Sequence, residues 1–198
     1  MTVAPRAVPV PKDNDREGFS LRKAGAFLKL KLLNLFGVGE RSAHLEKLSR
    51  DALLEVVDVK PFTLPDGTKR RGLLVFDFDD TLAVKDATSL PASSLAMMKQ
   101  LQADGFELAV LSNKQYTAQT RPRYAPLEAM GVLVVRNVAA KPSVKAFEGA
   151  LDQVSAKLGV TVKPASAAMI GDKASTDGGS ALAGIDFIEV EKFSGAGR

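Results

Sequence analysis

From Gly72 onward, short apolar runs alternate with segments of helical periodicity. This alternation is typical of a parallel sheet built from βαβ units, with helices covering both faces. Five strands are expected, at residues 73–78, 107–111, 132–135, 168–170 and 187–190. The predicted fold class is therefore α/β, with a doubly wound, Rossmann-like and mainly parallel five-stranded sheet.

Four helices are expected between these strands, at residues 91–103, 125–130, 143–158 and 176–183. The third has the clearest pattern, because its apolar residues recur at alternating intervals of three and four between a capping Ser143 and Gly159. Those residues are Val144, Phe147, Leu151, Val154 and Leu158. The spacing predicts a helix with one buried face.

The first 71 residues differ in charge from the rest of the chain. They carry 14 Lys/Arg and 9 Asp/Glu, a net charge of +5, whereas residues 72–198 carry 13 and 14, a net charge of −1. We expect a disordered tail over 1–17, a basic helical N-terminal extension over 18–71 and the α/β domain over 72–198. The tail lacks the apolar core of a signal peptide, and no stretch is long and apolar enough for a transmembrane helix. These features predict a cytoplasmic protein.

Residues 19–36 read as a basic amphipathic helix. Leucines lie on one face and Lys23, Lys31 and Asn34 lie roughly opposite. Two interpretations remain open: the helix packs on the domain, or it lies on an anionic membrane surface and makes the protein peripheral to it. A second helix is expected over 44–57, with His44 as a surface residue.

Polar side chains stand where the predicted strands end. Ligands of doubly wound sheets bind beyond the carboxyl ends of the strands, so these side chains share one expected crevice. They are Asp77 and Asp79 at the end of the first strand, Ser112 and Asn113 at the end of the second, Lys141 in the segment after the third and Asp172 at the end of the fourth. We expect carboxylates, a hydroxyl and an ammonium in a single site.

The kinds of metal and nucleophile available are limited by composition. The sequence has no cysteine and a single histidine, His44, which excludes thiolate metal sites, cysteine nucleophiles and His-rich metal centres. A metal must therefore be held by oxygen ligands, the set that Mg²⁺ prefers. Mg²⁺ is the predicted cofactor.

The residues of this crevice suit phosphoryl transfer, which needs a nucleophile, neutralised phosphate oxygens and a proton for the leaving oxygen. Asp77 is the predicted nucleophile and forms an acyl phosphate that water then hydrolyses. Asp79 is the predicted general acid and then general base. Asp77 and Asp172 can hold Mg²⁺, while Lys141 and Ser112 bind the remaining phosphate oxygens.

Four motifs occur in order along the chain: DFDDT, LAVLSN, AAKPS and MIGDKASTD. Together they resemble the motifs of the haloacid dehalogenase (HAD) superfamily, over about residues 72–190. The resemblance implies that Asp77 is the nucleophile and that Asp79 is the acid/base, whose backbone carbonyl also binds the metal, while Thr81 steadies their loop. It implies that Ser112 and Asn113 bind the phosphate and that Lys141 neutralises its charge. It further implies that Asp172 binds the metal and is supported by Asp177. A second aspartate, at Asp79, is typical of the phosphatases of this superfamily and not of its dehalogenases.

No room exists for the cap domain that many members carry. Only 25 residues lie between Asp86 and Ser112, and 30 lie between Lys141 and Asp172. A capless site implies a phosphorylated substrate whose bulk stays outside the crevice. Among capless members, the chain is most similar to the phosphatidylglycerophosphate phosphatase type, which usually has Asn where Asp80 stands and a Gly-Asn pair after the last motif.

Two other functions remain open. One is a nucleotide or polynucleotide-end phosphatase, with nucleic acid as the less favoured partner and with basic residues as phosphate contacts. These candidates are Lys69, Arg70, Arg71, Arg121 and Arg123, of which Arg121 and Arg123 flank Pro122 in an expected loop and are interpreted as solvated. The other is a non-catalytic phosphate-sensing or scaffold module on the same fold. The presence of Asp77, Asp79, Lys141 and Asp172 together favours the enzyme.

Overall fold

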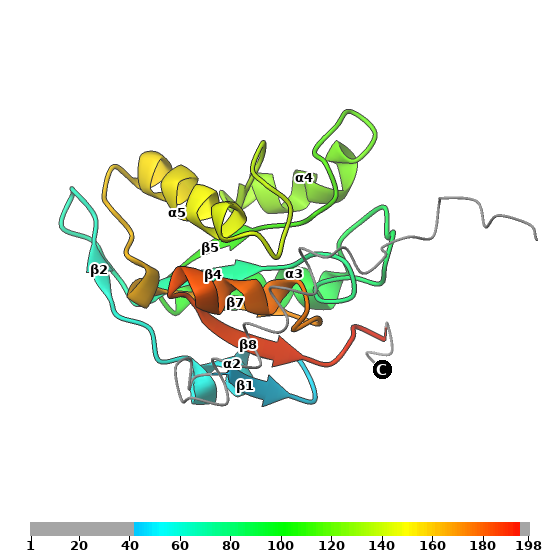
Figure 1. The fold of residues 1–198 in the computed structure, drawn as a ribbon, viewed down its shortest axis with the longest axis horizontal. Helices are drawn as coiled ribbons and strands as arrows, with labels where there is room; N and C mark the ends of the chain where they lie inside the picture. The colour runs from blue at the N-terminus through cyan, green and yellow to red at the C-terminus, as the bar shows by residue number, and fades with distance from the viewer. Residues whose placement is uncertain (1–41, 195–198) are drawn as a thin grey trace, which may run out of the picture.

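The computed structural model describes residues 42–194, and its ribbon is drawn in Figure 1. A six-stranded sheet has the order β1-β8-β7-β4-β5-β6, and every neighbouring pair is parallel. Its strands are β1 (Ser42–Leu45), β4 (Gly72–Phe76), β5 (Phe106–Val110), β6 (Leu133–Val134), β7 (Ala167–Gly171) and β8 (Asp186–Val190). A separate antiparallel pair joins β2 (Phe62–Thr63) to β3 (Lys69–Arg70). The predicted doubly wound parallel sheet is confirmed, with one strand more than expected.

Two hydrophobic cores lie on the two faces of the sheet. Leu74 and Phe76 of β4 belong to the core under α2 (Arg50–Val56), α3 (Ala92–Ala103) and α4 (Arg121–Ala129). Leu73 and Val75 belong to the opposite core, under α5 (Val144–Leu158) and the 3₁₀ helix η2 (Asp177–Ala183). A second, shorter 3₁₀ helix, η1 (Pro164–Ser166), precedes β7. Because both faces are covered, β4 is buried along its whole length, as central parallel strands usually are.

Helix α5 follows its predicted pattern closely. Its buried residues form one face against the sheet: Ala146, Phe147, Ala150, Leu151 and Val154. The helix ends at Gly159, which has a left-handed backbone with φ +67° and therefore suits glycine. Ser143 occupies the N-cap position, but its side chain makes no capping hydrogen bond.

The helix predicted over 44–57 is wrong in its first half. Residues 42–45 form the edge strand β1, which pairs with β8 and places His44 opposite Glu189. His44 is exposed, as expected, and its Nδ1 lies 3.7 Å from a carboxylate oxygen of Glu189. The helix itself begins at Arg50, because the Ser49 hydroxyl accepts a hydrogen bond from Ala52 N at 3.2 Å and caps the first turn. Four alternating residues were too short a pattern to identify the strand.

Two other elements differ from expectation. Helix α4 begins at Arg121 instead of residue 125, so Pro122 lies in its first turn, where its missing N–H costs nothing. The segment predicted as a helix over 176–183 is the 3₁₀ helix η2. The predicted tail over 1–17 and the predicted helix over 19–36 lie outside the described residues. Within residues 42–194, no helix has the length and apolar character needed to cross a membrane.

Candidate active site

A crevice of about 210 Å³ opens at the carboxyl ends of the central strands. The loop after β4, the loop after β5, the segment after β6 and the loop after β7 all contribute to it. Its lining consists of Asp77, Asp79, Asp80, Lys85, Asp86, Ser112, Asn113, Lys114, Lys141, Lys173 and Thr176. Five predicted site residues are thus brought together here, while their chemical roles remain predictions.

Asp77 follows β4 directly, and its backbone N–H donates to the Ile170 carbonyl of β7 at 2.8 Å. This bond fixes where the carboxylate leaves the sheet. The side chain is 13% exposed, and burial raises its pKa to about 6, an effect to which the Asp177 charge adds and which the Lys141 ammonium opposes. The predicted nucleophile therefore sits in a site that penalises its negative charge.

Lys141 is buried, and its ammonium contacts two carboxylates. Its Nζ lies 2.9 Å from Asp77 Oδ1 and 2.5 Å from Asp177 Oδ1. Burial alone would lower the pKa of Lys141, but Asp177 and Asp77 more than reverse this and leave the pKa raised. The side chain is therefore an ammonium at neutral pH, and it offers the crevice a fixed positive charge.

Asn113 positions the backbone of Lys141. Its Oδ1 accepts from Lys141 N at 2.7 Å, and its Nδ2 donates to the Lys141 carbonyl at 3.2 Å. The neighbouring Ser112 lines the same crevice, and its hydroxyl accepts from Lys114 N at 3.1 Å. The loop after β5 therefore holds the lysine segment in place as well as lining the crevice.

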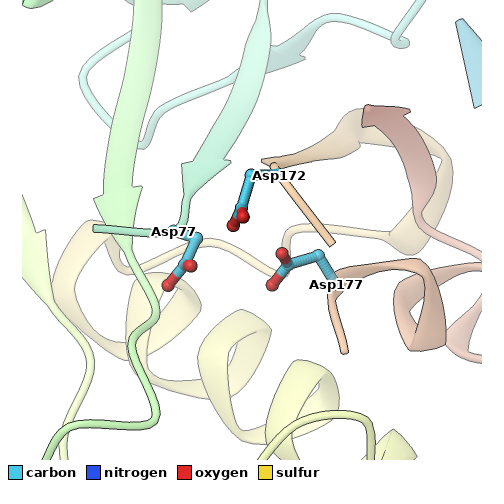
Figure 2. Close-up of side chains that lie close together, drawn as sticks. All are labelled: Asp77, Asp172 and Asp177. Atoms are coloured by element: carbon cyan, nitrogen blue, oxygen red, sulfur yellow. The ribbon is translucent and has the colours of Figure 1, made fainter. Parts of the chain in front are cut away.

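Asp172 directly follows β7 and lies near Asp177. Its backbone N–H donates to Thr81 Oγ1 at 3.1 Å, a bond that ties the loop after β7 to the loop after β4. Asp177 is fully buried and accepts from Lys173 N at 3.2 Å through its second oxygen. Figure 2 shows the side chains of Asp77, Asp172 and Asp177 lying close together.

This arrangement of carboxylates fits a divalent cation. Ligand oxygens of Asp77, Asp172 and Asp177 all lie within 4.8 Å of one another, and the Lys141 ammonium contacts Asp77 and Asp177. Oδ2 of Asp172 is buried without a hydrogen-bond partner, and burial together with the Asp77 charge raises the pKa of Asp172. Because both Asp177 oxygens already accept hydrogen bonds, Asp77 and Asp172 are the better ligands. Asp79, the third predicted ligand, contributes no side chain to this group.

Asp79 lies on the wall of the crevice, at the start of a tight loop. Its Oδ1 accepts from Asp86 N at 3.0 Å and forms an ion pair with the Arg123 guanidinium. The next residue, Asp80, has a left-handed backbone with φ +61°, and its Oδ1 accepts from Lys85 N at 3.1 Å. The loop is therefore closed by its own side chains and holds Asp79 beside the crevice.

Arg123 is the main residue whose place the sequence prediction got wrong. It was expected to be solvated in a loop, but it lies in α4, is 3% exposed and pairs with Asp79. Arg121 is exposed and does not line the crevice. Two signals could have revealed the helix and its buried face: Pro122 as a first-turn residue, and Tyr124 and Leu127 three residues apart.

The basic run before β4 lies away from the crevice. Lys69 and Arg70 form β3, and Arg71 precedes the first residue of β4, so all three are at the amino end of a strand whose carboxyl end carries the site. Arg70 lies 3.7 Å from Glu107, and the Arg71 guanidinium lies over the Phe106 ring. These three residues are therefore not phosphate contacts of this crevice. Sequence reasoning missed five other residues of the crevice lining, which lie within the motifs or shortly after them: Lys85, Asp86, Lys114, Lys173 and Thr176.

A parallel α/β sheet whose strand ends bring this aspartate, serine and lysine set together defines a HAD-like phosphatase. The family model described as mitochondrial PGP phosphatase matches residues 54–182, and the chain belongs to this family. A comparison with curated proteins finds no match.

Several solved structures are similar to the chain. An uncharacterized protein from Corynebacterium glutamicum is 20% identical with a TM-score of 0.47, and the match covers 63% of this chain and 88% of that one. The cobalt-bound deoxy-D-mannose-octulosonate 8-phosphate phosphatase of Haemophilus influenzae is 20% identical with a TM-score of 0.41, over 60% and 67% of the two chains. A putative HAD-like phosphatase of Mesorhizobium loti is 17% identical with a TM-score of 0.41, over 68% and 74%. At this level of similarity, nothing about substrate or metal transfers to this chain.

Proposed function

We propose that this phosphatase is a Mg²⁺-dependent phosphomonoester hydrolase that works through an aspartyl-phosphate on Asp77. The observation that carries the proposal is the position of the Asp77 carboxylate, which lies at a strand end, faces the crevice and contacts the Lys141 ammonium at 2.9 Å. A nucleophile of this kind needs nearby positive charge, because it attacks an anionic phosphate. Lys141 supplies one such charge from the protein itself.

The residues divide the two half-reactions between them. A carboxylate oxygen of Asp77 forms a bond to phosphorus as the bond to the leaving oxygen breaks, and Asp79 donates a proton to that oxygen. In the second half, Asp79 takes a proton from the water that attacks the phosphorus, which releases inorganic phosphate and restores Asp77. Lys141 and the Ser112 hydroxyl hold phosphate oxygens throughout.

Mg²⁺ is the proposed cofactor, since only oxygen ligands line this cluster of carboxylates. Asp77 and Asp172 would hold the ion, with the Asp79 carbonyl as a further ligand. When bound, Mg²⁺ supplies positive charge that offsets the repulsion between a carboxylate and an anionic phosphate. The unpartnered Oδ2 of Asp172 supports this assignment.

The proposed substrate is a phosphorylated lipid head group, such as phosphatidylglycerophosphate. A crevice of about 210 Å³ is smaller than the roughly 300–1,000 Å³ of sites that enclose a drug-sized ligand, so it suits a phosphate group whose attached bulk stays outside. The name of the matched family also favours this substrate. In the proposed arrangement, the basic amphipathic residues 19–36 bind an anionic membrane surface.

Neither alternative function gains support from the described residues. Nucleotide contacts through Lys69, Arg70 or Arg71 would lie at the wrong end of the sheet, and Arg123 is committed to Asp79. A non-catalytic module would not need Asp77 and Asp79 together at one crevice with a buried ammonium.

The chemistry is tested by the Asp77→Asn variant of the full chain, assayed for phosphate release from p-nitrophenyl phosphate and from phosphatidylglycerophosphate in mixed micelles. We expect loss of activity on both substrates, and loss of wild-type activity when EDTA removes divalent ions. The matched control is Asp51→Asn, the same change at a carboxylate that is 84% exposed on α2. Retained hydrolysis by Asp77→Asn would remove the nucleophile assignment.

Membrane binding is tested separately by flotation with phosphatidylglycerol vesicles. The full chain is compared with a version in which Lys23→Glu and Lys31→Glu reverse two charges of the predicted polar face. Each basic residue near an anionic surface contributes about 1 kcal/mol, so we expect the substituted chain to float much less. Equal flotation of the two chains would refute the membrane role of this segment and leave the catalytic proposal intact.

A further inference from the structure

Arg123 is a buried cation with few partners. Its side chain is 3% exposed, and its guanidinium lies 4.1 Å from the centre of the Phe78 ring and 5.4 Å from that of Tyr124. One terminal nitrogen pairs with Asp79 Oδ1, while Nε and Nη1 are buried without hydrogen-bond partners. A buried charge is costly unless it is paired, so the Asp79 carboxylate offsets the cost of burying this guanidinium.

The ion pair between Arg123 and Asp79 fixes the orientation of the Asp79 carboxylate. Oδ1 of Asp79 receives two donors, the Arg123 guanidinium and the Asp86 N–H at 3.0 Å. Two donors on one oxygen fix both the direction and the rotation of the carboxylate. Its Oδ2 has no hydrogen bond to the residues at 42–194, so it is the oxygen left for proton exchange at the crevice wall that Asp79 forms.

Aromatic packing in turn holds Arg123 in place. Phe78 meets Tyr124 edge-on with ring centres 5.1 Å apart, and Tyr124 stacks on Tyr116 at 5.8 Å. The guanidinium lies against the first two of these rings, so its position is set by packing between α4 and the loop after β4. This rigid support is what a residue needs in order to orient a catalytic neighbour.

We propose that Arg123 is a positioning residue that orients Asp79 for acid–base catalysis. The inference rests on the proposed function, because it assigns Arg123 to the step in which Asp79 exchanges a proton. Arg123 does not line the crevice and acts only through Asp79. Removing it frees the carboxylate to rotate, and the proton then reaches the leaving oxygen less often.

Leaving groups of different basicity isolate this effect. An alkyl phosphate expels a basic alkoxide and needs the proton, whereas p-nitrophenyl phosphate expels a stabilised anion and needs it little. General acid–base catalysis contributes about 10²–10⁴-fold, so a partial loss of orientation should be visible on the alkyl substrate alone. A purely structural defect would lower kcat on both substrates by the same factor.

The experiment compares wild type with Arg123→Met, which keeps an apolar side chain against Phe78 but has no charge. We expect kcat on glycerol phosphate to fall by at least about tenfold more than kcat on p-nitrophenyl phosphate, with little change in KM. Arg123→Lys keeps the positive charge and an ammonium donor but not the planar guanidinium, and it should recover part of the loss. The matched control is Arg121→Met, an exposed arginine of the same helix, which should match wild type on both substrates.

A double variant gives a second measurement. Adding Arg123→Met to Asp79→Asn should cause no further loss of kcat on the alkyl substrate, since the group that Arg123 orients is already disabled. The proposal would be overturned if the double variant lost kcat by the product of the two factors that the single variants lose. If Arg123→Met unfolds, the two substrates are compared with Arg123→Lys. Equal losses of kcat on both substrates, or no loss on either, would then refute the proposal.

Failure of the inference differs from failure of the proposed function. If wild type hydrolyses neither substrate, or if Asp77→Asn stays active, the proposed function fails and the inference fails with it. If wild type is active, Asp77→Asn is inactive and Arg123→Met affects both substrates equally or neither, only the role of Arg123 is refuted.

Discussion

The ammonium of Lys141 lies 2.5 Å from the Asp177 carboxylate, and neither side chain is more than 2% exposed. Asp177 begins η2, while Lys141 belongs to the segment after β6, so the pair joins two elements across the site. The same ammonium contacts Asp77 at 2.9 Å. One buried charge therefore supports both the structure around the crevice and the predicted nucleophile.

Replacing Lys141 with methionine should destabilise the protein and abolish its activity. The change leaves Asp77 and Asp177 buried without their cation, and breaking a buried ion pair in this way costs about 3–5 kcal/mol. Urea unfolding at neutral pH measures the loss, with the exposed Lys145→Met on α5 as the control. Wild-type stability in Lys141→Met would contradict the structural part of this role.

The free energy of unfolding should depend on pH through Asp77. Burial raises its pKa to about 6 from 3.8, so between these values the folded chain binds a proton that the unfolded chain has released. Stability contributed by Asp77 therefore falls as pH rises through this window, by about 3 kcal/mol in total. The pKa values of Asp172 and Asp177 are also raised, which adds a change of the same sign.

The measurement is the difference in unfolding free energy between wild type and Asp77→Asn, taken in EDTA from about pH 4 to about pH 7. Asparagine does not titrate, so the difference isolates the contribution of Asp77 from those of the other carboxylates. We expect the advantage of wild type to shrink as pH rises. A difference that stays constant across the window would show that the Asp77 pKa is not raised by folding.

Alanine at Gly171 should disrupt the same site from the backbone. A Cβ there would lie 2.3 Å from Asp177 Oδ2, too close for any real contact, so Asp177 or its backbone must shift and the contact between Asp177 and Lys141 is disturbed. Overpacking of this kind costs about 1–3 kcal/mol, and displacing the buried pair should lower kcat as well. The control is Gly67→Ala, whose φ of +86° carries strain but whose Cβ meets nothing within 4 Å. We expect Gly67→Ala to lower the melting temperature without lowering kcat.

Mg²⁺ should raise the melting temperature of the protein, because an ion that binds only the folded state stabilises it by mass action. At about 100 times the dissociation constant the gain is about 2.7 kcal/mol. Asp172→Asn should remove most of this gain, and Asp152→Asn, an exposed aspartate on α5, should keep it. Calorimetry with and without MgCl₂ checks this, and an undiminished shift in Asp172→Asn would exclude that residue as a ligand.

Many residues of the candidate site could be predicted from sequence, because their positions follow from one geometric rule. Parallel strands end at the same edge of a sheet, so Asp77, Ser112 and Asp172 could be placed together from strand positions alone. Structure was needed where the partner is distant in sequence. The helix that carries Arg123 could have been inferred from local signals, but its contacts with Phe78 and Asp79 could not, because these residues lie more than 40 positions earlier in the chain.

The additional strand shows the same limit. Residues 42–45 form β1 because β8 offers them a free edge, and Ser42 pairs with Phe187 from the other end of the chain. Local sequence could not reveal this partner. The helix that follows was therefore predicted to begin at residue 44, within the strand, when it begins at Arg50. The role of Asn113 in holding the Lys141 backbone also depends on how two loops meet.

The left-handed backbone at Asp80 bears on which substitutions can persist at this position over evolutionary time. Aspartate and asparagine tolerate φ +61° better than other residues with a side chain, and both can accept the Lys85 N–H bond that closes the loop. The Asn that the sequence resemblance led us to expect at this position and the Asp found here are therefore two solutions to one conformational demand. Valine and isoleucine satisfy neither condition, because they disfavour a positive φ and have no acceptor for the Lys85 N–H, so lineages that carry this loop should drift between Asp and Asn and avoid these two residues.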